Sequence, residues 1–162
     1  MALAPRTPTA DLPARLAAAE ALCRARGARL TEMRREVYAM LLDNAAPLAA
    51  YDLMARLDRK LDRRLAPPTV YRALEFLLAH GLIHRLESTN AYMPCVHPGE
   101  AHESVYFLCS RCGSTAEVAD TRIGGLIHRG AQDLHFKPTR QVVEVQGLCE
   151  DCDEPAPARR RA

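Results

Sequence analysis

The sequence of 162 residues lacks any apolar run of the roughly 18 to 20 residues that a membrane-spanning helix needs. Its first residues, MALAPRTPTADLP, also lack the apolar core of a secretion signal. Both absences favour a cytosolic protein, in a compartment that keeps thiols reduced. An excess of one charge is missing as well, because 22 Lys and Arg face 20 Asp and Glu. The net charge of +2 neither indicates nor excludes a nucleic acid partner, since binding depends on a local basic face.

Cysteine and histidine stand out against this background, with six residues of each. In a reducing compartment, six cysteines indicate metal ligands or redox centres rather than a disulfide framework. The 48% of apolar and 26% of charged residues fit a folded globular protein. The length allows one large domain or two small ones.

The first half of the chain has the periodicity of amphipathic helices. Helices are expected in four segments: 11–26, 31–41, 51–61 and 67–80. Thr31 is placed to cap the second helix, and Pro67-Pro68 to start the fourth. Two short extended runs around the polar turn Ser88-Thr89-Asn90 then predict a β-hairpin. Helices followed by a hairpin are typical of a winged helix-turn-helix, in which 67–80 would be the recognition helix.

The second half has the shorter alternation of strands, with one helical segment among them. Strands are expected at 105–109, 115–118 and 141–148, and a helix over 123–134. The order β-β-α-β predicts a small α+β domain.

The predicted fold class is therefore α+β, with two domains and a connection between them. The boundaries are a winged-helix domain at 11–88, a hinge at 89–94, a second domain at 95–152, and flexible tails at 1–10 and 153–162. The Arg159-Arg160-Arg161 run in the last segment is interpreted as a solvated group of charges, and the alternative is a nonspecific contact with DNA.

Four of the cysteines form two knuckles, Cys109-x-x-Cys112 and Cys149-x-x-Cys152, with 36 residues between them. Each knuckle can present two thiolates to one ion, and two knuckles complete a tetrahedral zinc site. Such a closed site is structural, because it leaves no coordination position for water or substrate. The alternative is a thioredoxin-like redox pair. That pair opens a helix, whereas Cys112 is followed by Gly113 and a predicted strand.

A second, mixed set of ligands is indicated by Cys95 and His102, which flank a loop that contains Pro and Gly. His84 lies one hairpin strand away from Cys95. A tetrahedral zinc site needs one more ligand, and Glu117, on the strand after the first knuckle, is a candidate. His97 could replace His102. The alternative is an ordinary loop with a free thiol.

The stretch P-P-T-V-Y-R-A-L-E-F-L-L-A-H-G-L-I-H-R-L-E-S-T-N-A-Y resembles the recognition helix and wing of the ferric uptake regulator family. Y-F-L-C-S-R-C-G and G-L-C-E-D-C resemble the paired zinc knuckles of that family. E-S-T-N-A-Y-M-P-C, and the A-H pair seven residues ahead of the first knuckle, are most similar to its zinc uptake regulator branch. The resemblance covers residues 10–152.

The resemblance implies a bacterial, cytoplasmic, homodimeric repressor of zinc uptake genes and not an enzyme. It would bind double-stranded, palindromic operator DNA through its N-terminal domain and dimerise through its C-terminal domain. Two zinc ions per chain are implied, a structural one on the four knuckle cysteines and a sensory one. By motif, the sensory ligands would be His84, Cys95, His102 and Glu117. The residues expected to contact DNA are Thr69, Tyr71 and Arg72 at the exposed start of the fourth helix, with Tyr51 and Arg34 as backbone contacts.

An ion bound by all four sensory ligands would fix the angle between the DNA reader and the dimer core. In a dimer this also fixes the distance between the two recognition helices, about one turn of DNA. Zinc and DNA would then each raise the affinity of the protein for the other.

Departures from the family pattern bear on which metal is sensed. Iron-sensing relatives carry a histidine-rich run where this chain has H-P-G-E-A-H-E-S, and many relatives have a histidine where this chain has Gln146. Within the family, the alternatives are sensors of iron, manganese or peroxide. The Cys95 thiolate weighs against them, because harder ions favour oxygen and nitrogen ligands. Outside the family, the alternatives are a zinc-ribbon interaction module and a thiol oxidoreductase.

Overall fold

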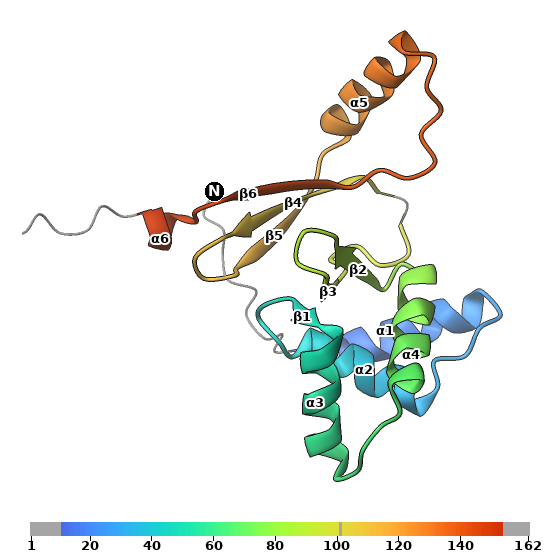
Figure 1. Ribbon diagram of the computed structural model, residues 1–162. Coiled ribbons are helices and arrows are strands. Elements are labelled where there is room, and N and C mark those ends of the chain that lie inside the picture. Colours follow the sequence, from blue (N-terminus) through green and yellow to red (C-terminus); the bar gives the residue numbers. More distant parts are fainter. Residues whose placement is uncertain (1–10, 101, 154–162) are drawn as a thin grey trace, which may run out of the picture. The chain divides into compact units, whose positions relative to one another are not determined.

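Helices fill most of the first part of the chain, and strands and helices alternate in the second part (Figure 1). The computed structural model describes residues 11–100 and 102–153, and no helix in these ranges is long and apolar enough to cross a membrane. The chain divides into two compact units, of which the first ends at His102 and the second begins at Glu103. The predicted tails, with the Arg159–Arg161 run, lie outside the described residues, except that Asp153 is the last residue of a short helix.

The described part of the first unit consists of helices and a small sheet. Its elements are α1 (Leu12–Ala25), α2 (Glu32–Leu42), β1 (Leu48–Ala49), α3 (Ala50–Leu61), α4 (Pro67–Ala79), β2 (Ile83–Leu86) and β3 (Ala91–Pro94). Pro67 stands in the first turn of α4, as predicted, and Gly27, with a φ of 69°, follows the end of α1. Thr31 occupies the N-cap position of α2, but its side chain makes no capping hydrogen bond.

Helices α2, α3 and α4 share one apolar core. Val37 of α2, Leu57 of α3 and Leu77 of α4 are each 0% exposed. Complete burial of one such side chain stabilises the fold by about 1.5–3 kcal/mol. The core therefore holds α4 by one face, so that its opposite face can remain exposed.

The sheet of the first unit has the strand order β1-β3-β2, and both pairings are antiparallel. Strands β2 and β3 form the predicted hairpin, with His84 opposite Met93. Asn90 closes the turn with a φ of 50°, in the left-handed region that asparagine tolerates. The helices followed by this hairpin give the predicted winged helix-turn-helix arrangement (Figure 1).

The residues assigned to a hinge, 89–94, lie in the hairpin. Residues 91–94 form β3, which pairs on both sides and is buried throughout. The first unit then continues through Cys95 to His102. Pro94 is the last residue of β3 and lies opposite Ile83 of β2. The functional domain boundaries themselves stay predictions.

The second unit has the predicted α+β composition. Its described elements are β4 (Ser104–Cys109), β5 (Thr115–Ala119), α5 (Thr121–Asp133), β6 (Val143–Gly147) and the short α6 (Glu150–Asp153). The strand order is β5-β4-β6, in which β4 pairs antiparallel with β5 and parallel with β6. The parallel pairing places Cys109 opposite Gly147, so the two strands end side by side.

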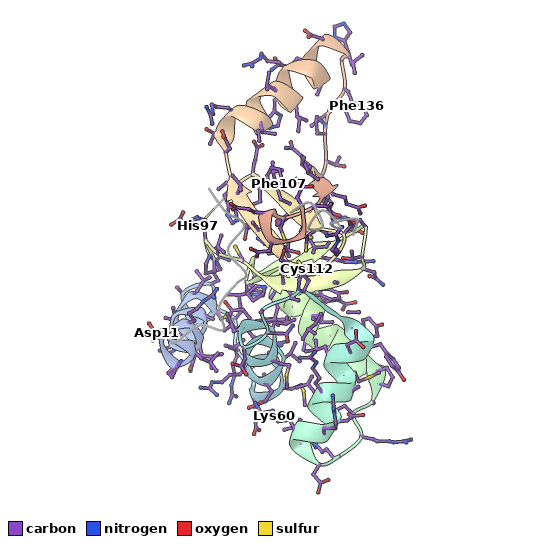
Figure 2. The ribbon with its side chains drawn as sticks, turned by 90° about the vertical axis from the view of Figure 1, so that its left-hand side faces the viewer. Asp11, Lys60, His97, Phe107, Cys112 and Phe136 are labelled. Carbon is purple, nitrogen blue, oxygen red and sulfur yellow. The ribbon has the colours of Figure 1, made fainter. Side chains whose placement is uncertain are left out.

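Helix α5 stands away from the sheet of its own unit (Figure 1), and Phe136 follows it (Figure 2). Asp120 caps this helix by accepting a hydrogen bond from the Arg122 N–H. The Arg122 guanidinium also donates to the same carboxylate, and these bonds lower the pKa of Asp120 to about 2. Leu126, Leu134 and Phe136 are 61%, 79% and 66% exposed, so this unit leaves apolar side chains uncovered.

Candidate metal sites and DNA-facing helix

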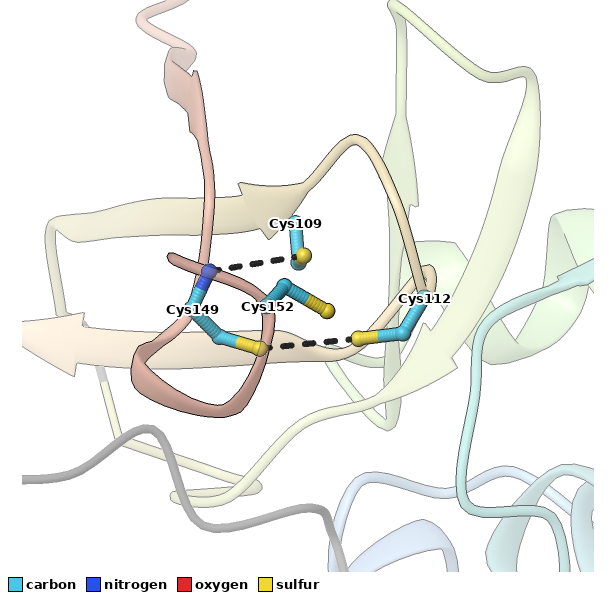
Figure 3. Close-up of side chains that lie close together, drawn as sticks. All are labelled: Cys109, Cys112, Cys149 and Cys152. Carbon is cyan, nitrogen blue, oxygen red and sulfur yellow. Dashed lines mark hydrogen bonds between the residues drawn. The ribbon is translucent and has the colours of Figure 1, made fainter. Parts of the chain in front are cut away.

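The ends of β4 and β6 bring the four knuckle cysteines together (Figure 3). Their four sulfur atoms lie within 4.8 Å of one another. Cys112 Sγ is 3.6 Å from Cys149 Sγ, and the backbone N–H of Cys149 donates to Cys109 Sγ at 3.4 Å. Zinc–sulfur bonds of about 2.3 Å in a tetrahedron separate the sulfurs by about 3.8 Å. The cluster therefore has the size and donor set of a closed zinc site.

Hydrogen bonds already favour thiolate character in part of this cluster. Backbone N–H groups of Cys112 and Cys149 lower the pKa of Cys109 to about 5. The Ser114 side chain lowers the pKa of Cys112. The neighbouring Cys149 side chain, followed by burial, raises the pKa of Cys152 to about 12. The sulfurs therefore do not ionise together on their own, and a divalent cation would supply the charge that four adjacent thiolates require.

The first knuckle does not have the setting of a redox dithiol. Cys112 is followed by Gly113, with a φ of 74°, and then by β5 instead of a helix. Helix α6, which follows Cys149, has four residues. Arg111 donates to the carbonyl of Cys152, which ties the first knuckle to the second. These contacts suit a clip between two strand ends.

A second group of ligand atoms lies within the first unit. His84 is on β2, Cys95 directly follows β3, and His102 ends the loop after it. The backbone N–H of Cys95 donates to the carbonyl of Leu82 at 2.9 Å, which places the start of the loop beside β2. Cys95 Sγ is 3.4 Å from His102 Nε2, and the rings of His84 and His102 are 5.5 Å apart, nearly perpendicular.

Contacts around these side chains set the orientation of their potential donor atoms. Cys95 is 0% exposed. His102 Nδ1 lies 2.9 Å from the carbonyl oxygen of Glu100, which can only accept, so this contact favours the tautomer with the proton on Nδ1. In that tautomer His102 Nε2, which faces Cys95, is free of a proton, as in the usual arrangement of a metal-binding histidine. One sulfur and two nitrogens fit zinc and leave one position of a tetrahedron for a fourth donor.

His97 lies outside this group of ligand atoms. It is exposed on the loop that follows β3 (Figure 2), and its ring is 5.9 Å from that of His102. Because His102 Nε2 lies 3.4 Å from Cys95 Sγ and belongs to the cluster of ligand atoms, His102 is favoured over His97 as the ligand.

Glu117 belongs to the second unit, in the middle of β5 opposite Tyr106. It is half-buried, and the hydroxyl of Ser104 donates to its Oε1 at 2.6 Å. Ser104 therefore orients the Glu117 carboxylate. No sequence motif indicated this serine, because the contact depends on strand pairing between β4 and β5.

Helix α4 presents the polar face that was predicted to read DNA. Val70, Ala73, Leu74 and Leu77 are buried, whereas Thr69, Tyr71 and Arg72 are exposed. Tyr71 is 48% exposed, and Tyr51, at the start of α3, is 75% exposed. Large aromatic side chains left in solvent beside a polar helix face are available for a partner.

Arg34 has a contact that the sequence did not indicate. Its guanidinium lies 3.6 Å from the centre of the Phe76 ring, and it donates to the carbonyl of Arg29 at 2.6 Å. The His80 ring also stacks on Phe76, with the ring centres 3.9 Å apart. Arg34 therefore fastens α2 to α4.

Comparison with known proteins agrees with this geometry. The Ferric uptake regulator family model matches residues 25–146. The Zinc uptake regulation protein of Escherichia coli (strain K12) is 39% identical over 150 residues, which are 92% of this chain and 85% of that protein. A solved Zinc Uptake Regulator complexed with zinc and DNA has a TM-score of 0.84 at 36% identity, over 88% of this chain and 95% of that one. Holo XcZur has a TM-score of 0.77 at 41% identity, over 84% and 94% of the two chains. The chain belongs to the ferric uptake regulator family.

Proposed function

We propose that this protein is a zinc-responsive transcriptional repressor, which binds palindromic operator DNA as a homodimer when its sensory zinc site is filled. The genes that it controls are those of zinc uptake. The observation that carries the proposal is the group of His84, Cys95 and His102 beside the winged helix, with Cys95 Sγ 3.4 Å from His102 Nε2. Such a regulator acts on the chromosome in the bacterial cytoplasm and performs no catalysis.

Two zinc ions per chain follow from the two donor sets. Cys109, Cys112, Cys149 and Cys152 would hold the structural ion, entirely within the second unit. Because that site is closed and consists of thiolates, its ion stabilises the fold of the unit and exchanges slowly. If the ion at this site serves only to stabilise the fold, the zinc that exchanges with the cell and regulates DNA binding would be the one at the sensory site.

The sensory ion would be held by His84, Cys95 and His102, with Glu117 as the fourth ligand. The first three belong to the first unit and Glu117 to the second. Four-coordinate zinc would supply a link that restricts the motion of one unit relative to the other. The DNA-reading helices of the dimer would then be ordered before they meet DNA, which lowers the entropy lost on binding. By linkage, operator DNA must raise zinc affinity by the same factor.

DNA would be read by the exposed face of α4. Arg72 can donate hydrogen bonds to the O6 and N7 atoms of guanine or to a phosphate, and Tyr71 can contact a phosphate or a thymine methyl. Thr69, about one helical turn before Arg72, is the third proposed contact. Tyr51 and Arg34 are proposed as backbone contacts. For Arg34 this requires the guanidinium to reach phosphate while it packs on Phe76.

The second copy of the chain would cover the apolar side chains of the second unit. Leu134 and Phe136 are among its most exposed large apolar residues, and they border an open hollow of about 400 Å³ that Val142 and Val143 also line. A dimer formed through this unit places two winged helices on one palindrome, as the two-fold symmetry of such operators requires.

The sensed metal is inferred from the donor set. Iron and manganese sensors would be expected to use nitrogen and oxygen ligands, whereas Cys95 contributes a buried sulfur. Zinc accepts all of the proposed donors.

The experiment that tests the proposal is a DNA-binding titration against buffered free zinc, with metal content measured in the same samples. Palindromic DNA should be bound in a zinc-dependent manner, with matched titrations of manganese and ferrous ions giving weaker responses. DNA affinity that does not change with free zinc would overturn the proposal.

A further inference from the structure

The loop from Cys95 to His102 carries two of the sensory ligands but has no regular secondary structure among its described residues. It contains Pro98 and Gly99, and its described residues make no helix or strand, so its conformation depends on contacts with other segments of the first unit. A metal site is most selective when its ligands are held in place before the ion arrives. The residues that hold this loop are consequently part of how the site works.

Two arginines of helix α1 provide the support. Arg15 donates to the carbonyl of Cys95 at 3.0 Å. Arg26, which caps the end of α1, donates to the carbonyl of Gly99 at 3.2 Å and to that of His80 at 2.9 Å. The planar guanidinium has several N–H groups in fixed directions, so one arginine can hold two carbonyls.

Leu22 lies between these two arginines on α1, and it closely approaches Gly99 of the loop. Gly99 has a φ of 93°, and a Cβ added there would lie 2.9 Å from Cδ1 of Leu22. The backbone conformation therefore favours glycine at this position, and any side chain there would have to displace the end of Leu22. The close approach places the Gly99 carbonyl within reach of Arg26.

The second carbonyl held by Arg26 belongs to the end of α4. His80 is the C-cap of this helix, and its ring packs on Phe76 at 3.9 Å. The chain then turns through Gly81 to Leu82, whose carbonyl accepts the N–H of Cys95. The end of the DNA-reading helix and the loop between Cys95 and His102 are thus joined through one side chain.

We infer that Arg26, supported by Arg15, is a positioning residue that couples the sensory ligands to the DNA-reading helix within the first unit. This inference rests on the proposed function. When Arg26 holds both carbonyls, the loop is ordered in the conformation in which Cys95 and His102 face each other. The same guanidinium makes the position of the loop depend on the position of α4. Loss of the bridge should lower zinc affinity and also reduce the gain in DNA affinity that zinc produces.

The variants for the test are Arg26→Gln, Arg26→Lys and Arg15→Gln in the full chain, with Arg24→Gln as the matched control. Arg24 lies on the same helix, is highly exposed and pairs with Glu20 at 3.1 Å. Zinc affinity of the exchangeable site is measured by chelator competition. Cobalt(II) added after the four-cysteine site has been filled with zinc reports thiolate ligation by Cys95 through its absorption bands. DNA affinity is measured without metal and at saturating zinc, together with the melting temperature.

Mutation of a residue that hydrogen-bonds a metal ligand lowers metal affinity by roughly 10–100-fold. Arg26 contacts the backbone of the loop and not a ligand side chain, so its effect should be smaller. Arg26→Gln should therefore weaken zinc binding at the exchangeable site by about 3- to 10-fold. It should also reduce the ratio of the DNA affinity at saturating zinc to the DNA affinity without metal. Arg26→Lys should be intermediate, because an ammonium group does not hold two carbonyls in one plane. Arg24→Gln should match the wild type.

The inference is overturned if Arg26→Gln behaves as Arg24→Gln in zinc affinity and in the DNA ratio. It is also overturned if only the melting temperature falls, since this would show a merely structural role. If Arg26→Gln does not fold, Arg26→Lys and Arg15→Gln decide by the same measurements. A wild type whose DNA affinity ignores zinc would reject the proposed function, whereas a zinc-responsive wild type with an unaffected Arg26→Gln rejects only the positioning role.

Discussion

The Sγ atom of Cys95 lies 3.4 Å from Nε2 of His102, although seven positions separate the two residues in the chain. The bond from His102 Nδ1 to the Glu100 carbonyl turns the other nitrogen toward the sulfur. A soft sulfur and an imidazole nitrogen that face each other in a partly buried setting are suited to zinc.

This relationship predicts different effects for the two histidines of the loop. His102→Ala should remove a ligand and lower zinc affinity at the exchangeable site by more than about tenfold, since even a residue behind a ligand contributes that much. His97→Ala should leave the affinity nearly unchanged, because the exposed His97 ring is 5.9 Å from His102 and outside the ligand group. Chelator competition on both variants measures this. Equal losses, or a larger loss for His97→Ala, would reverse the assignment.

Metal removal should separate the two proposed zinc ions. The fully loaded, DNA-binding protein should contain two zinc ions per chain, and mild chelation should remove one. The retained ion is the one on the four cysteines, because that site is closed and lies inside one unit. Elemental analysis before and after chelation tests the prediction. A DNA-binding form that holds at most one zinc per chain is incompatible with it.

Much of this architecture is local in the sequence and could be predicted from it. Helix signals act within a turn or two of the chain, so they can be recognised from the sequence. Examples are the apolar spacing of Leu53 and Leu57 in α3, Pro67 at the start of α4, and Gly27 after α1. The C-x-x-C spacing likewise encodes a knuckle. The two knuckles are brought together by the parallel pairing of β4 with β6, which places Cys109 opposite Gly147.

What could not be predicted depends on contacts between distant segments. Strand β1 has two residues, too few to show an alternation. The contact of Arg34 with Phe76, and that of Arg26 with the Gly99 carbonyl, join residues far apart in the chain through side chains that are common on any exposed helix. The predicted hairpin did not reveal that β3 also pairs with β1, because Leu48 and Ala49 lie far from Tyr92 and Ala91 in the chain.

The stack of Arg34 on Phe76 predicts two separable effects of changing this arginine. Arg34→Ala should lower stability by about 0.5–1 kcal/mol, the usual value of a cation–π contact that is not deeply buried. Arg34→Met keeps an unbranched side chain over the ring and should recover part of that stability. If the guanidinium also contacts phosphate, both variants should bind DNA more weakly and with a shallower salt dependence. Melting curves and DNA titrations at several salt concentrations distinguish the roles, and unchanged DNA binding would leave Arg34 with the packing role alone.

Arg72 should contribute to DNA binding without contributing to the fold, because it is exposed on the face of α4 opposite the core. Arg72→Ala should leave the dimer and both zinc ions intact. If Arg72 reads a base, operator affinity falls by about 1–3 kcal/mol and the loss depends on sequence. If it contacts only phosphate, binding weakens on all sequences and the salt dependence becomes shallower. Affinities for operator and scrambled DNA, with Arg24→Ala as control, test this, and an unaffected Arg72→Ala would contradict the placement of α4 on DNA.

Substitution of single cysteines should distinguish the two metal sites. Cys95→Ser preserves the size of the side chain but replaces a thiolate with a hydroxyl, which zinc binds far less well. Zinc should then no longer drive DNA binding in the range that serves the wild type. The fold and the dimer should survive, because the four-cysteine cluster lies in the second unit and is untouched.

Cys109→Ser should cause the opposite damage. Cys109 ends β4, is 3% exposed and accepts the N–H of Cys149, so its loss opens the clip between the ends of β4 and β6. The melting temperature and the dimer fraction should fall together, since the unit that would form the dimer loses its metal. Comparison of melting temperature, dimer fraction and zinc-dependent DNA affinity in both variants is decisive. If Cys95→Ser keeps wild-type zinc-dependent DNA binding, the sensory site is misassigned, and Cys95 is only a buried thiol at the end of the wing.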